Sequence, residues 1–355
     1  MSTSHPRPRS TMLRAAAGSA AAATLVLATG CNGIGGSDDL TEIEIALPTG
    51  VTSMANSDIA VADELGYFEE AGLEVEVTNL RSGSSVTNGV VGGDFQFGGA
   101  SIEPVINAFA GGADIRVIAG YTDRLEVDVV VPEEVQNVAD LQGRELGIQE
   151  IGAFREVMTR MMLEDAQMTP EDVEYVSVSA DAYVSALIQG QIASAVLHPE
   201  QAIQATEQLE DAGEVDGLHS LLNLYEVEPD YFYGAYFVSA AWLEENPEQA
   251  QAFAEAITRA HRTMYDDREE VVPIIASEVG MDEEIIDQAW ETYMVDVQAF
   301  PVNEGVEEDR LAYTLERMEE MATLADGAEP DLDELVDRTP IEAAVEELGR
   351  VDERD

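Results

Sequence analysis

One stretch, residues 93–120, restricts the possible folds more than any other part of the chain, because strand-like and helix-like segments alternate in it between glycine pairs. Residues 95–97 alternate apolar and polar side chains as a short strand does, and we expect Gly98-Gly99 to end that strand. An apolar helix over residues 104–110 follows, with Ser101 available as its N-cap, before a second glycine pair and a β-branched run. A strand end that opens onto a helix N-terminus presents free backbone N–H groups, which predicts a binding site for a small polar molecule.

The N-terminal 31 residues have the pattern of a secretion signal, in which three arginines precede an alanine-rich apolar run that ends at Cys31. The last five of these residues, LATGC, resemble the lipobox of bacterial lipoproteins, whose cysteine is lipidated and becomes the mature N-terminus. We therefore expect a lipoprotein signal peptide over residues 1–31, with a plain signal peptide or an uncleaved anchor as the alternatives. Residues 32–39 are expected to form a short tether rich in glycine and serine.

Cys31 is the only cysteine, which excludes disulfides within the chain, cysteine metal clusters and a thiol nucleophile in the folded part. All 17 basic residues are arginines, and the absence of lysine excludes a Schiff base. No Ser/His/Asp arrangement in a catalytic context is present, so we expect a protein that is not an enzyme and has no cofactor. The histidines, at positions 5, 198, 219 and 261, lack the spacing of metal ligands, and no metal site is expected.

The charge balance is strongly acidic, because 14 arginines and 72 acidic residues follow Cys31, a formal charge of −58 for that part of the chain. A nucleic-acid partner is excluded, since neutralising phosphates needs a basic patch. We interpret the acidic residues as a solvated surface suited to high salt, where screening shortens the range of their mutual repulsion. A role in cation binding is the alternative.

Strands and short helices alternate along the chain, which is typical of an α/β fold with parallel βαβ units and helices on both faces of a sheet. Residues 41–47 and 73–77 are alternating strands of a first series, and a second series begins near residue 146. The two series share a plan, since residues 93–98 and 190–195 each place a glycine and a short strand after a helix. The length after the tether, about 315 residues, suits two domains of ordinary size. We expect two similar lobes that face each other across a cleft.

The second half of the chain is expected to return to the first lobe. An apolar run at residues 231–240 predicts a buried strand that crosses back, and the remainder has the pattern of helices. Asn246-Pro247 and Thr339-Pro340 have the chemistry of helix starts. The expected division is residues 40–130 for the first lobe, 131–229 for the second lobe, and 230–355 for the return to the first lobe with a helical C-terminal segment.

Three segments carry a family resemblance: ADELGYFEEAGLEV at residues 62–75, GDFQFG at residues 93–98 and DLQGRELGI at residues 140–148. In this order they resemble the substrate-binding lipoproteins of ABC importers in the nitrate/sulfonate/taurine group (SsuA/THI5-like, NMT1-like), which also contains binders of the thiamine pyrimidine. The resemblance covers residues 43–291. It implies a two-lobed periplasmic-binding-protein-like fold of type II, with two hinge crossings, that closes on a ligand and delivers it to a permease driven by a separate ATPase.

The family resemblance implies that the ligand contacts come from turns at the strand ends, three in each lobe. The helix N-termini in these turns offer N–H groups and a partial positive charge, which suits an anion such as a sulfonate or a nitrate. The candidate ligand-binding residues are Met54, Asn56, Ser57, Ser82, Ser84, Ser85, Gly99, Ala100, Ser101, Tyr121, Gln149, Gly152, Ala153, Phe154, Arg155, Asp181, Tyr183, His198 and Glu200.

Several of these candidates have an alternative structural role. Arg155 is expected either to pair with an anionic ligand at the mouth of the cleft or to pair on the surface with a residue one helical turn away. Glu103 is expected either to hold a ligand ammonium or simply to favour a helix start. His198 is either a ligand contact or an ordinary loop histidine. Tyr121 and Tyr183 either stack on a flat ligand or pack in the core.

Carboxylates expected near the cleft, Glu103, Asp181 and Glu200, argue against an anion unless an arginine or a ligand amine lies between them. The predicted function is the extracytoplasmic solute-binding component of an ABC importer, with a sulfonate-, nitrate- or taurine-like anion as the first ligand class. A thiamine-precursor pyrimidine, another small heterocycle or a zwitterion is the second class, and a ligand-sensing lipoprotein is the remaining alternative. The expected partners are the solute, the ABC permease and ATPase subunits, and the outer face of the cell membrane through the lipid on Cys31, with a monomeric protein.

Overall fold

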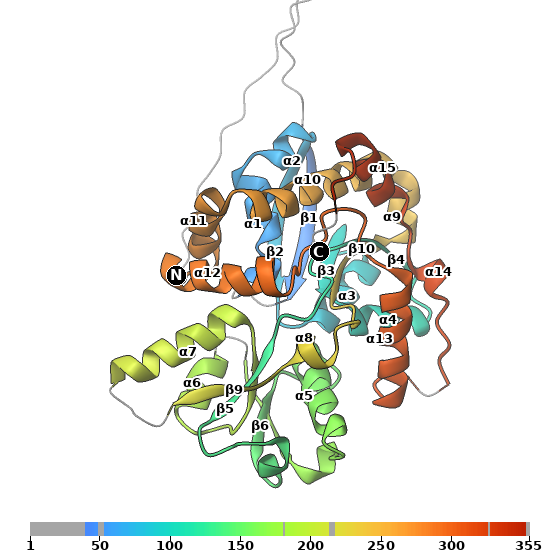
Figure 1. Cartoon of the computed structure of the whole chain (residues 1–355). Coiled ribbons are helices and arrows are strands. Elements are labelled where there is room, and N and C mark those ends of the chain that lie inside the picture. The colour runs from blue at the N-terminus through green and yellow to red at the C-terminus, as the bar shows by residue number, and fades with distance from the viewer. Residues whose placement is uncertain (1–39, 49–52, 180–181, 213–216, 326, 353–355) are drawn as a thin grey trace, which may run out of the picture. The chain divides into compact units, whose positions relative to one another are not determined.

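The computed structural model describes residues 40–48, 53–179, 182–212, 217–325 and 327–352. These residues form two groups of strands, each covered by helices (Figure 1). The first group is a five-stranded sheet in the order β2-β1-β3-β10-β4, and the second group consists of a three-stranded sheet, β8-β5-β9, and a two-stranded sheet, β6-β7. We call each group with its helices a lobe.

The first lobe contains segments from both ends of the described chain. Its strands are β1 (Thr41–Pro48), β2 (Leu73–Leu80), β3 (Phe97–Ser101), β4 (Ile115–Gly120) and β10 (Gly234–Ser239). Its helices before β10 are the 3-10 turn η1 (Met54–Asn56), α1 (Asp58–Glu64), α2 (Tyr67–Glu70), α3 (Gly83–Gly92) and α4 (Ile102–Ala110). Those after β10 are α9 (Ala240–Glu245), α10 (Pro247–Asp266), α11 (Arg268–Val279), α12 (Glu283–Glu291), the π-helical turn η5 (Thr292–Asp296), α13 (Glu308–Glu320), α14 (Leu332–Leu335) and α15 (Thr339–Leu348).

The alternation of apolar and acidic residues in β1 places one set of side chains in the core. Ile43, Ile45 and Leu47 are buried, as is Ala46, whereas Glu42 and Glu44 are exposed. β1 pairs in parallel with both β2 and β3, as the alternation of strands and helices predicts. β10 instead lies antiparallel between β3 and β4, because the chain reaches it from the second lobe.

The glycine pair Gly98-Gly99 lies inside β3, so the prediction that it ends the strand is wrong. A Cβ atom on Gly98 would lie 2.6 Å from the ring of Phe237, and one on Gly99 would lie 2.8 Å from Tyr236 and from Leu47. Large side chains of the neighbouring strands therefore occupy the space that a side chain of β3 would need. Glycine is required at these positions for packing and not for a turn.

The second lobe is built from the middle of the chain. Its strands are β5 (Asp128–Pro132), β6 (Glu145–Ile148), β7 (Glu174–Ser177), β8 (Ala195–Leu197) and β9 (Leu218–Asn223). Its helices are η2 (Val138–Leu141), α5 (Phe154–Asp165), η3 (Pro170–Asp172), α6 (Tyr183–Ile188), α7 (Pro199–Ala212) and α8 (Leu224–Val227). β6 and β7 are the expected parallel pair, whereas β5 is antiparallel to both β8 and β9, so the prediction of parallel units does not extend to it. β5 also spans the boundary expected between residues 130 and 131.

Two crossings connect the lobes, residues 121–127 after β4 and residues 228–233 before β10. Arg310 of α13 is in contact with both of them. Its guanidinium donates a hydrogen bond to the carbonyl oxygen of Asp123 at 3.2 Å and another to that of Pro229 at 2.9 Å. α13 therefore holds the two crossings together.

The C-terminal helices cover the first lobe, and α10 and α15 pack against each other (Figure 1). α10 begins at Pro247 as predicted, but the side chain of Asn246 donates back to Trp242 and does not cap the helix. In α15 the apolar residues Ile341 and Val345 are buried, which is the face that the sequence pattern predicts.

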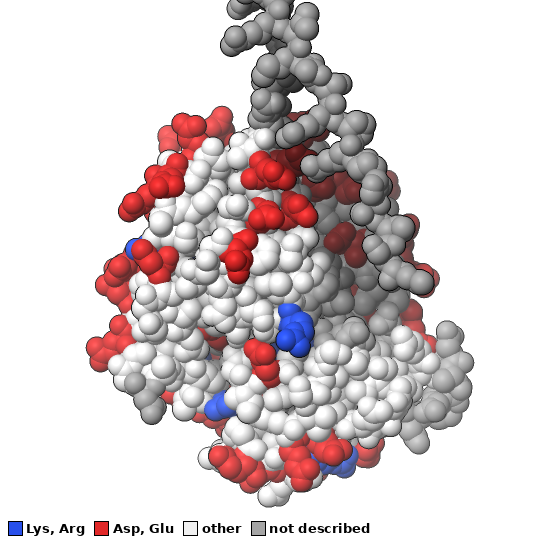
Figure 2. Space-filling model, turned by 180° about the vertical axis from the view of Figure 1, so that it is seen from behind, with Lys and Arg blue, Asp and Glu red and all other residues white. Residues whose placement is uncertain are grey.

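The face shown in Figure 2 carries many acidic side chains and few arginines. Within the described ranges, no group of three or more histidine, cysteine or acidic side chains is arranged to hold a metal ion. The helices of those ranges are too short or too polar to cross a membrane.

Candidate ligand-binding site

A cavity of about 50 Å³ lies at the strand ends of both lobes. The residues that follow the carboxyl ends of β1, β2, β3 and β4 in the first lobe, and of β6 and β8 in the second, contribute to its wall. The carboxyl ends of strands are where α/β folds place their ligands. The lining residues are Pro48, Ser53, Asn56, Gly83, Ser84, Ser101, Pro104, Tyr121, Gln149, Ala153, Phe154, Arg155, His198 and Tyr233.

The lobes contact each other directly around this cavity. The backbone N–H of Met54 donates to Oε1 of Glu200 at 3.2 Å, and Nε2 of Gln149 donates to the carbonyl oxygen of Arg81 at 3.3 Å. Each water molecule in a buried cavity needs roughly 10–15 Å³ of the cavity volume. With about 50 Å³, this cavity holds only a few waters or a very small solute. A larger ligand requires the lobes to separate.

Four helices begin at the cavity wall: α3, α4, α5 and α7. Ser82 caps α3 by accepting a hydrogen bond from the N–H of Ser85 at 3.3 Å. Ser101 stands at the N-cap of α4 but makes no side-chain cap bond, so its predicted capping role is wrong. Ala153, at the N-cap of α5, has no side chain that could cap the helix. The start of α4 offers little to a ligand, since the N–H of Ile102 donates to the carbonyl oxygen of Tyr233 at 2.8 Å and Pro104 has no N–H. α5 starts beside the cavity without a side-chain cap, which suits an oxygen-rich anion.

Arg155 is the only arginine in the cavity wall, and its side chain is 4% exposed. It donates hydrogen bonds to the carbonyl oxygen of Val196 and, at 3.2 Å, to Oε1 of Gln201, and its guanidinium lies 4.4 Å from the ring centre of Tyr183. The alternative of a surface ion pair is wrong because the group is buried. Within the part of the chain that the structure describes, no carboxylate forms an ion pair with it. A buried cation with neutral partners is well suited to an anionic ligand.

Asn56 adds an unused hydrogen-bond donor to the wall. Its Nδ2 atom is buried, and it has no partner among the described residues. A buried donor without a partner costs free energy, so an acceptor on a ligand would stabilise it.

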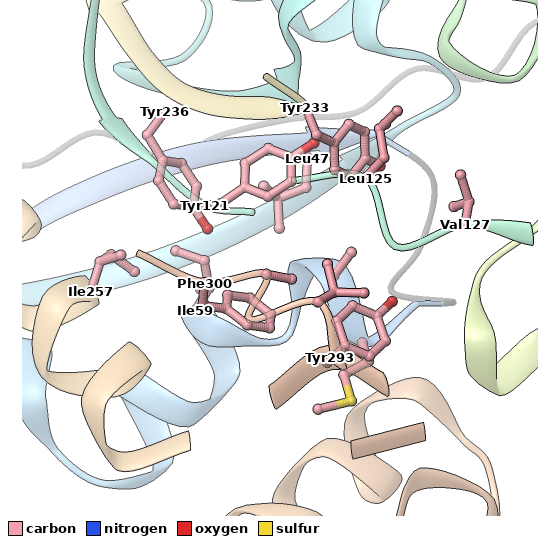
Figure 3. Close-up of a cluster of buried hydrophobic side chains, with 14 of the residues drawn as sticks. Leu47, Ile59, Tyr121, Leu125, Val127, Tyr233, Tyr236, Ile257, Tyr293 and Phe300 are labelled. Atoms are coloured by element: carbon pink, nitrogen blue, oxygen red, sulfur yellow. The ribbon is translucent and has the colours of Figure 1, made fainter. Parts of the chain in front are cut away.

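Aromatic rings form the apolar part of the wall. The ring centres of Phe154 and Tyr233 are 4.3 Å apart. Those of Tyr121 and Tyr233, which lie side by side in Figure 3, are 5.6 Å apart in an edge-to-face arrangement. His198 lies beside them, with its ring centre 6.1 Å from that of Phe154. Tyr121 is packed in the core, which is one of the two roles considered for it, and it also lines the cavity.

Three glutamates surround the cavity without lining it. Glu103 accepts a hydrogen bond from the hydroxyl of Tyr231 at 2.8 Å, Glu126 lies 2.6 Å from Nδ1 of His198, and Glu200 accepts from Met54. All three are fully buried, and burial raises the pKa of each carboxyl. For Glu126 the pKa rises to about 8. A carboxyl that stays protonated does not repel an anion, so Glu126 opposes an anionic ligand less than an ionised carboxylate would.

The structure brings together nine of the predicted site residues in the cavity wall: Asn56, Ser84, Ser101, Tyr121, Gln149, Ala153, Phe154, Arg155 and His198. The other predicted residues within the described ranges do not line it: Met54, Ser57, Ser82, Ser85, Gly99, Ala100, Gly152, Tyr183 and Glu200. Tyr183 packs under Arg155 instead. Asp181 and Cys31 lie outside the described residues.

Sequence reasoning missed five lining residues: Pro48, Ser53, Gly83, Pro104 and Tyr233. Tyr233 is the last residue of the second crossing, just before β10, and it brings an aromatic ring to the point where both crossings pass the cavity. An aromatic residue directly before a strand that crosses back was the available signal.

A larger groove of about 720 Å³ lies along β1 and β2, bounded by α1 and α11. Six acidic residues and no arginine line it: Glu42, Asp63, Glu64, Glu74, Glu76 and Glu278. Its size is in the range of ligand sites and it shares Asn56 with the smaller cavity, but its carboxylates would repel an anion, and among the described residues none from the second lobe lines it. We therefore assign the ligand site to the smaller cavity.

Known proteins with the same architecture include solute-binding proteins. The chain is 22% identical over 337 residues to a putative aliphatic sulfonates-binding protein of Bacillus subtilis (strain 168), which covers 92% of this chain and 95% of the relative. The periplasmic aliphatic sulphonate binding protein SsuA from Escherichia coli matches with a TM-score of 0.63 and 16% identity over 84% of this chain and 92% of its own. The periplasmic nitrate-binding protein NrtA from Synechocystis PCC 6803 matches with a TM-score of 0.70 and 14% identity over 88% of this chain and 90% of its own.

These likenesses identify the two-lobed arrangement as the periplasmic-binding-protein fold. The model of one family, described as NMT1/THI5 like, matches residues 55–271, which include most of the cavity wall. The chain belongs to the NMT1/THI5-like family.

Proposed function

We propose that this chain is the solute-binding component of an ABC importer and that it captures a small anion of the sulfonate or nitrate class between its lobes. The observation that carries the proposal is the buried guanidinium of Arg155, which lines the cavity in the first turn of α5 without a carboxylate partner among the described residues. Helix N-termini, the guanidinium and the free amide of Asn56 are all donors or positive groups. The names of the sulfonate- and nitrate-binding relatives agree with this ligand class.

A thermal-shift and calorimetry screen tests the ligand class. The purified protein is mixed with nitrate, methanesulfonate, ethanesulfonate, taurine and the thiamine pyrimidine, at constant high ionic strength because of the acidic surface. A ligand at 100 times its dissociation constant stabilises a protein by about 2.7 kcal/mol, which is readily measured. Binding of a sulfonate or nitrate supports the proposal, and binding of only neutral or cationic compounds contradicts it.

Arg155→Gln tests the assigned residue. Removing a charged hydrogen-bonding partner costs about 1.5–3 kcal/mol, so we expect affinity for the anion to fall by at least tenfold. Arg144→Gln is the matched control, because Arg144 is half-exposed and pairs only with the exposed Glu134. Equal affinities of the two variants would remove Arg155 from the site.

A zwitterion or a pyrimidine is the second ligand class. It is favoured by the buried carboxyls of Glu103, Glu126 and Glu200, which would accept hydrogen bonds from ligand N–H groups if the lobes bound it in a more open arrangement. The same screen separates the classes, since taurine carries an ammonium group that ethanesulfonate lacks. A much higher affinity for taurine than for ethanesulfonate would favour this second class.

Anchoring to the outer face of the cell membrane through Cys31 is part of the proposal, and it is supported by the LATGC sequence. Cys31→Ser is expected to abolish incorporation of a labelled fatty acid and to release the protein from the membrane fraction. Continued labelling of the variant would exclude this anchor. Import is distinguished from sensing by solute uptake, which deletion of the protein abolishes only in the first case.

A further inference from the structure

The buried pair Glu126 and His198 links the first crossing to the cavity. Oε1 of Glu126 lies 2.6 Å from Nδ1 of His198, and the exposed fraction of Glu126 is 0%. His198 lies just before α7 and lines the cavity, whereas Glu126 does not. Nδ1 is therefore engaged by the crossing, and Nε2 is the ring nitrogen left for a ligand.

The proton between the two residues decides what His198 offers to the cavity. A neutral imidazole has one donor and one acceptor nitrogen. An ionised Glu126 accepts a hydrogen bond from Nδ1–H, which leaves Nε2 as an acceptor in the neutral ring. A protonated Glu126 donates to Nδ1 instead, so that Nε2 carries the hydrogen and becomes a donor.

We propose that Glu126 is a positioning residue for ligand recognition, because its protonated carboxyl donates to Nδ1 of His198 and fixes the tautomer that presents Nε2–H to the cavity. The inference rests on the proposed anion site, since an Nε2–H donor attracts an anion oxygen and an Nε2 lone pair repels it. It adds to that function a residue that does not itself line the cavity.

Burial supports the neutral form of both partners. It raises the pKa of Glu126 to about 8 and lowers the pKa of His198 to about 3. A contact of 2.6 Å suits a hydrogen bond between the neutral groups as well as an ion pair. At a fully buried position the cost of desolvating two charges favours the neutral pair, a carboxylic acid and a neutral imidazole.

Charged and titratable groups from every packed element act on this pair. Arg155 lowers the pKa of Glu126 through its charge, and the hydroxyl of Tyr293, 3.4 Å from Oε1, also favours the ionised form. Glu200 raises the pKa of His198 but is itself buried and held toward its protonated form. Desolvation exceeds these effects. The groups that interact electrostatically with Glu126 are Arg155 from α5, Glu200 from α7, Tyr293 from η5, Asp128 from β5, and Tyr121 and Tyr233 from the two crossings.

Nitrogen NMR of the histidine rings tests the inference without any ligand. In protein labelled with 15N-histidine, couplings between ring nitrogens and carbon-bound protons distinguish the two neutral tautomers and the imidazolium. The signals of His198 are identified by their absence from the spectrum of the His198→Gln variant. We expect the Nε2–H tautomer at pH 6 and a change to the Nδ1–H tautomer with a midpoint near the pKa of Glu126, about 8. An imidazolium or an Nδ1–H ring at pH 6 would overturn the proposal. The measurement is made on the ligand-free protein, so it does not depend on which ligand binds.

Glu126→Gln removes the titrating proton while keeping the shape of the side chain. The tautomer of His198 should then stay the same between pH 6 and pH 9.5, whereas Glu103→Gln, which changes another buried glutamate, should leave the normal change in place. A tautomer change that persists in Glu126→Gln would assign the proton to another group and overturn the inference.

Affinity separates this inference from the proposed function. With ethanesulfonate as the probe, the unaltered protein should bind at least tenfold more weakly at pH 9.5 than at pH 6, and Glu126→Gln should lose that dependence. Absence of ethanesulfonate and nitrate binding at every pH, together with the expected tautomer change, would contradict the anion site but support the role of Glu126 in setting the ring. If the protein bound ethanesulfonate as tightly at pH 9.5, with His198 in the Nδ1–H form, as at pH 6, the proposed role of Glu126 would be contradicted.

Discussion

Oε1 of Glu200, in the second lobe, accepts a hydrogen bond from the backbone N–H of Met54, in the first lobe, at a distance of 3.2 Å. Both residues are fully buried, and Glu200 belongs to the first turn of α7, directly after the ligand-lining His198. Because this bond joins the lobes beside the cavity, it stabilises the arrangement in which they enclose a ligand.

Glu200→Ala is therefore expected to weaken binding. It leaves the N–H of Met54 buried without a partner, which costs about 1–3 kcal/mol and corresponds to a loss of affinity of roughly 5- to 150-fold. Calorimetry with the best-binding anion measures the loss, and small-angle scattering should show a larger radius of gyration. Gln208→Ala, an exposed change on the same helix, is the control, and the same affinity in both variants would exclude this role of Glu200.

Arg317 of α13 connects the second crossing to the second lobe. Its guanidinium lies 2.7 Å from the buried Glu228 and 3.3 Å from Glu164 at the end of α5. We expect Arg317→Ala to lower the free energy of unfolding by about 1–3 kcal/mol, because it leaves the carboxyl of Glu228 with one partner fewer in a buried place.

Arg268→Ala is the matched comparison for this arginine. Arg268 pairs with two carboxylates, Asp287 and Glu291, and both are more than half exposed, whereas the four carboxylate partners of Arg317 include the buried Glu228. Surface ion pairs contribute about 0–1 kcal/mol, so the unfolding midpoint in urea should move little. Equal destabilisation by Arg317→Ala and Arg268→Ala would show that the contact of Arg317 with Glu228 adds nothing to the free energy of unfolding.

Gly98 is a position where an added methyl group should be harmful. Its Cβ would lie 2.6 Å from Phe237 and 2.9 Å from Val86, and overpacking of this kind costs about 1–3 kcal/mol. Gly217→Ala is the control, because no atom lies within 4 Å of the added carbon there. Chemical unfolding at fixed salt compares the two, and a Gly98→Ala protein as stable as Gly217→Ala would contradict the packing argument.

The two glycines of β3 also explain what the sequence could predict of the fold. β1 was predictable because its alternation alone places Ile43 and Ile45 on the buried side. Gly98 and Gly99 were misread as a turn because their role depends on Phe237 and on other residues distant in the sequence. Local patterns thus located strands such as β1 and β2 but not β9, and the antiparallel position of β10 depends on tertiary contacts.

The same limit applies to the site. Turns at strand ends were predictable, since the parallel arrangement brings them to one edge, and the family resemblance added which turns to consider. Glu126 was not predictable, because in the segment Leu125 to Val127 an acidic residue between two apolar ones has the pattern of a half-exposed strand. The crossing instead turns this side chain inward toward His198, and only the packing of the second lobe reveals it.

Glu126 makes stability depend on pH in a definite direction. Its pKa in the folded state, about 8, is above the ordinary value of 4.5, so the folded protein holds this proton more tightly than the unfolded chain. The associated stability is fully present below about pH 4.5 and is lost as the pH rises through 8. His198 acts in the opposite direction and at lower pH, since its pKa falls from 6.5 to about 3 and its contribution is constant above pH 6.5.

The window between pH 6.5 and pH 8 therefore isolates Glu126 from His198. One pH unit corresponds to about 1.4 kcal/mol per proton, so the unaltered protein should lose about 2 kcal/mol across this window relative to Glu126→Gln. The quantity to measure is the difference between the two free energies of unfolding at each pH, because Asp123 and the other buried acids titrate in both proteins and cancel. A constant difference would mean that Glu126 is already ionised at pH 6.5, and His198 would then face the cavity as an acceptor or an imidazolium.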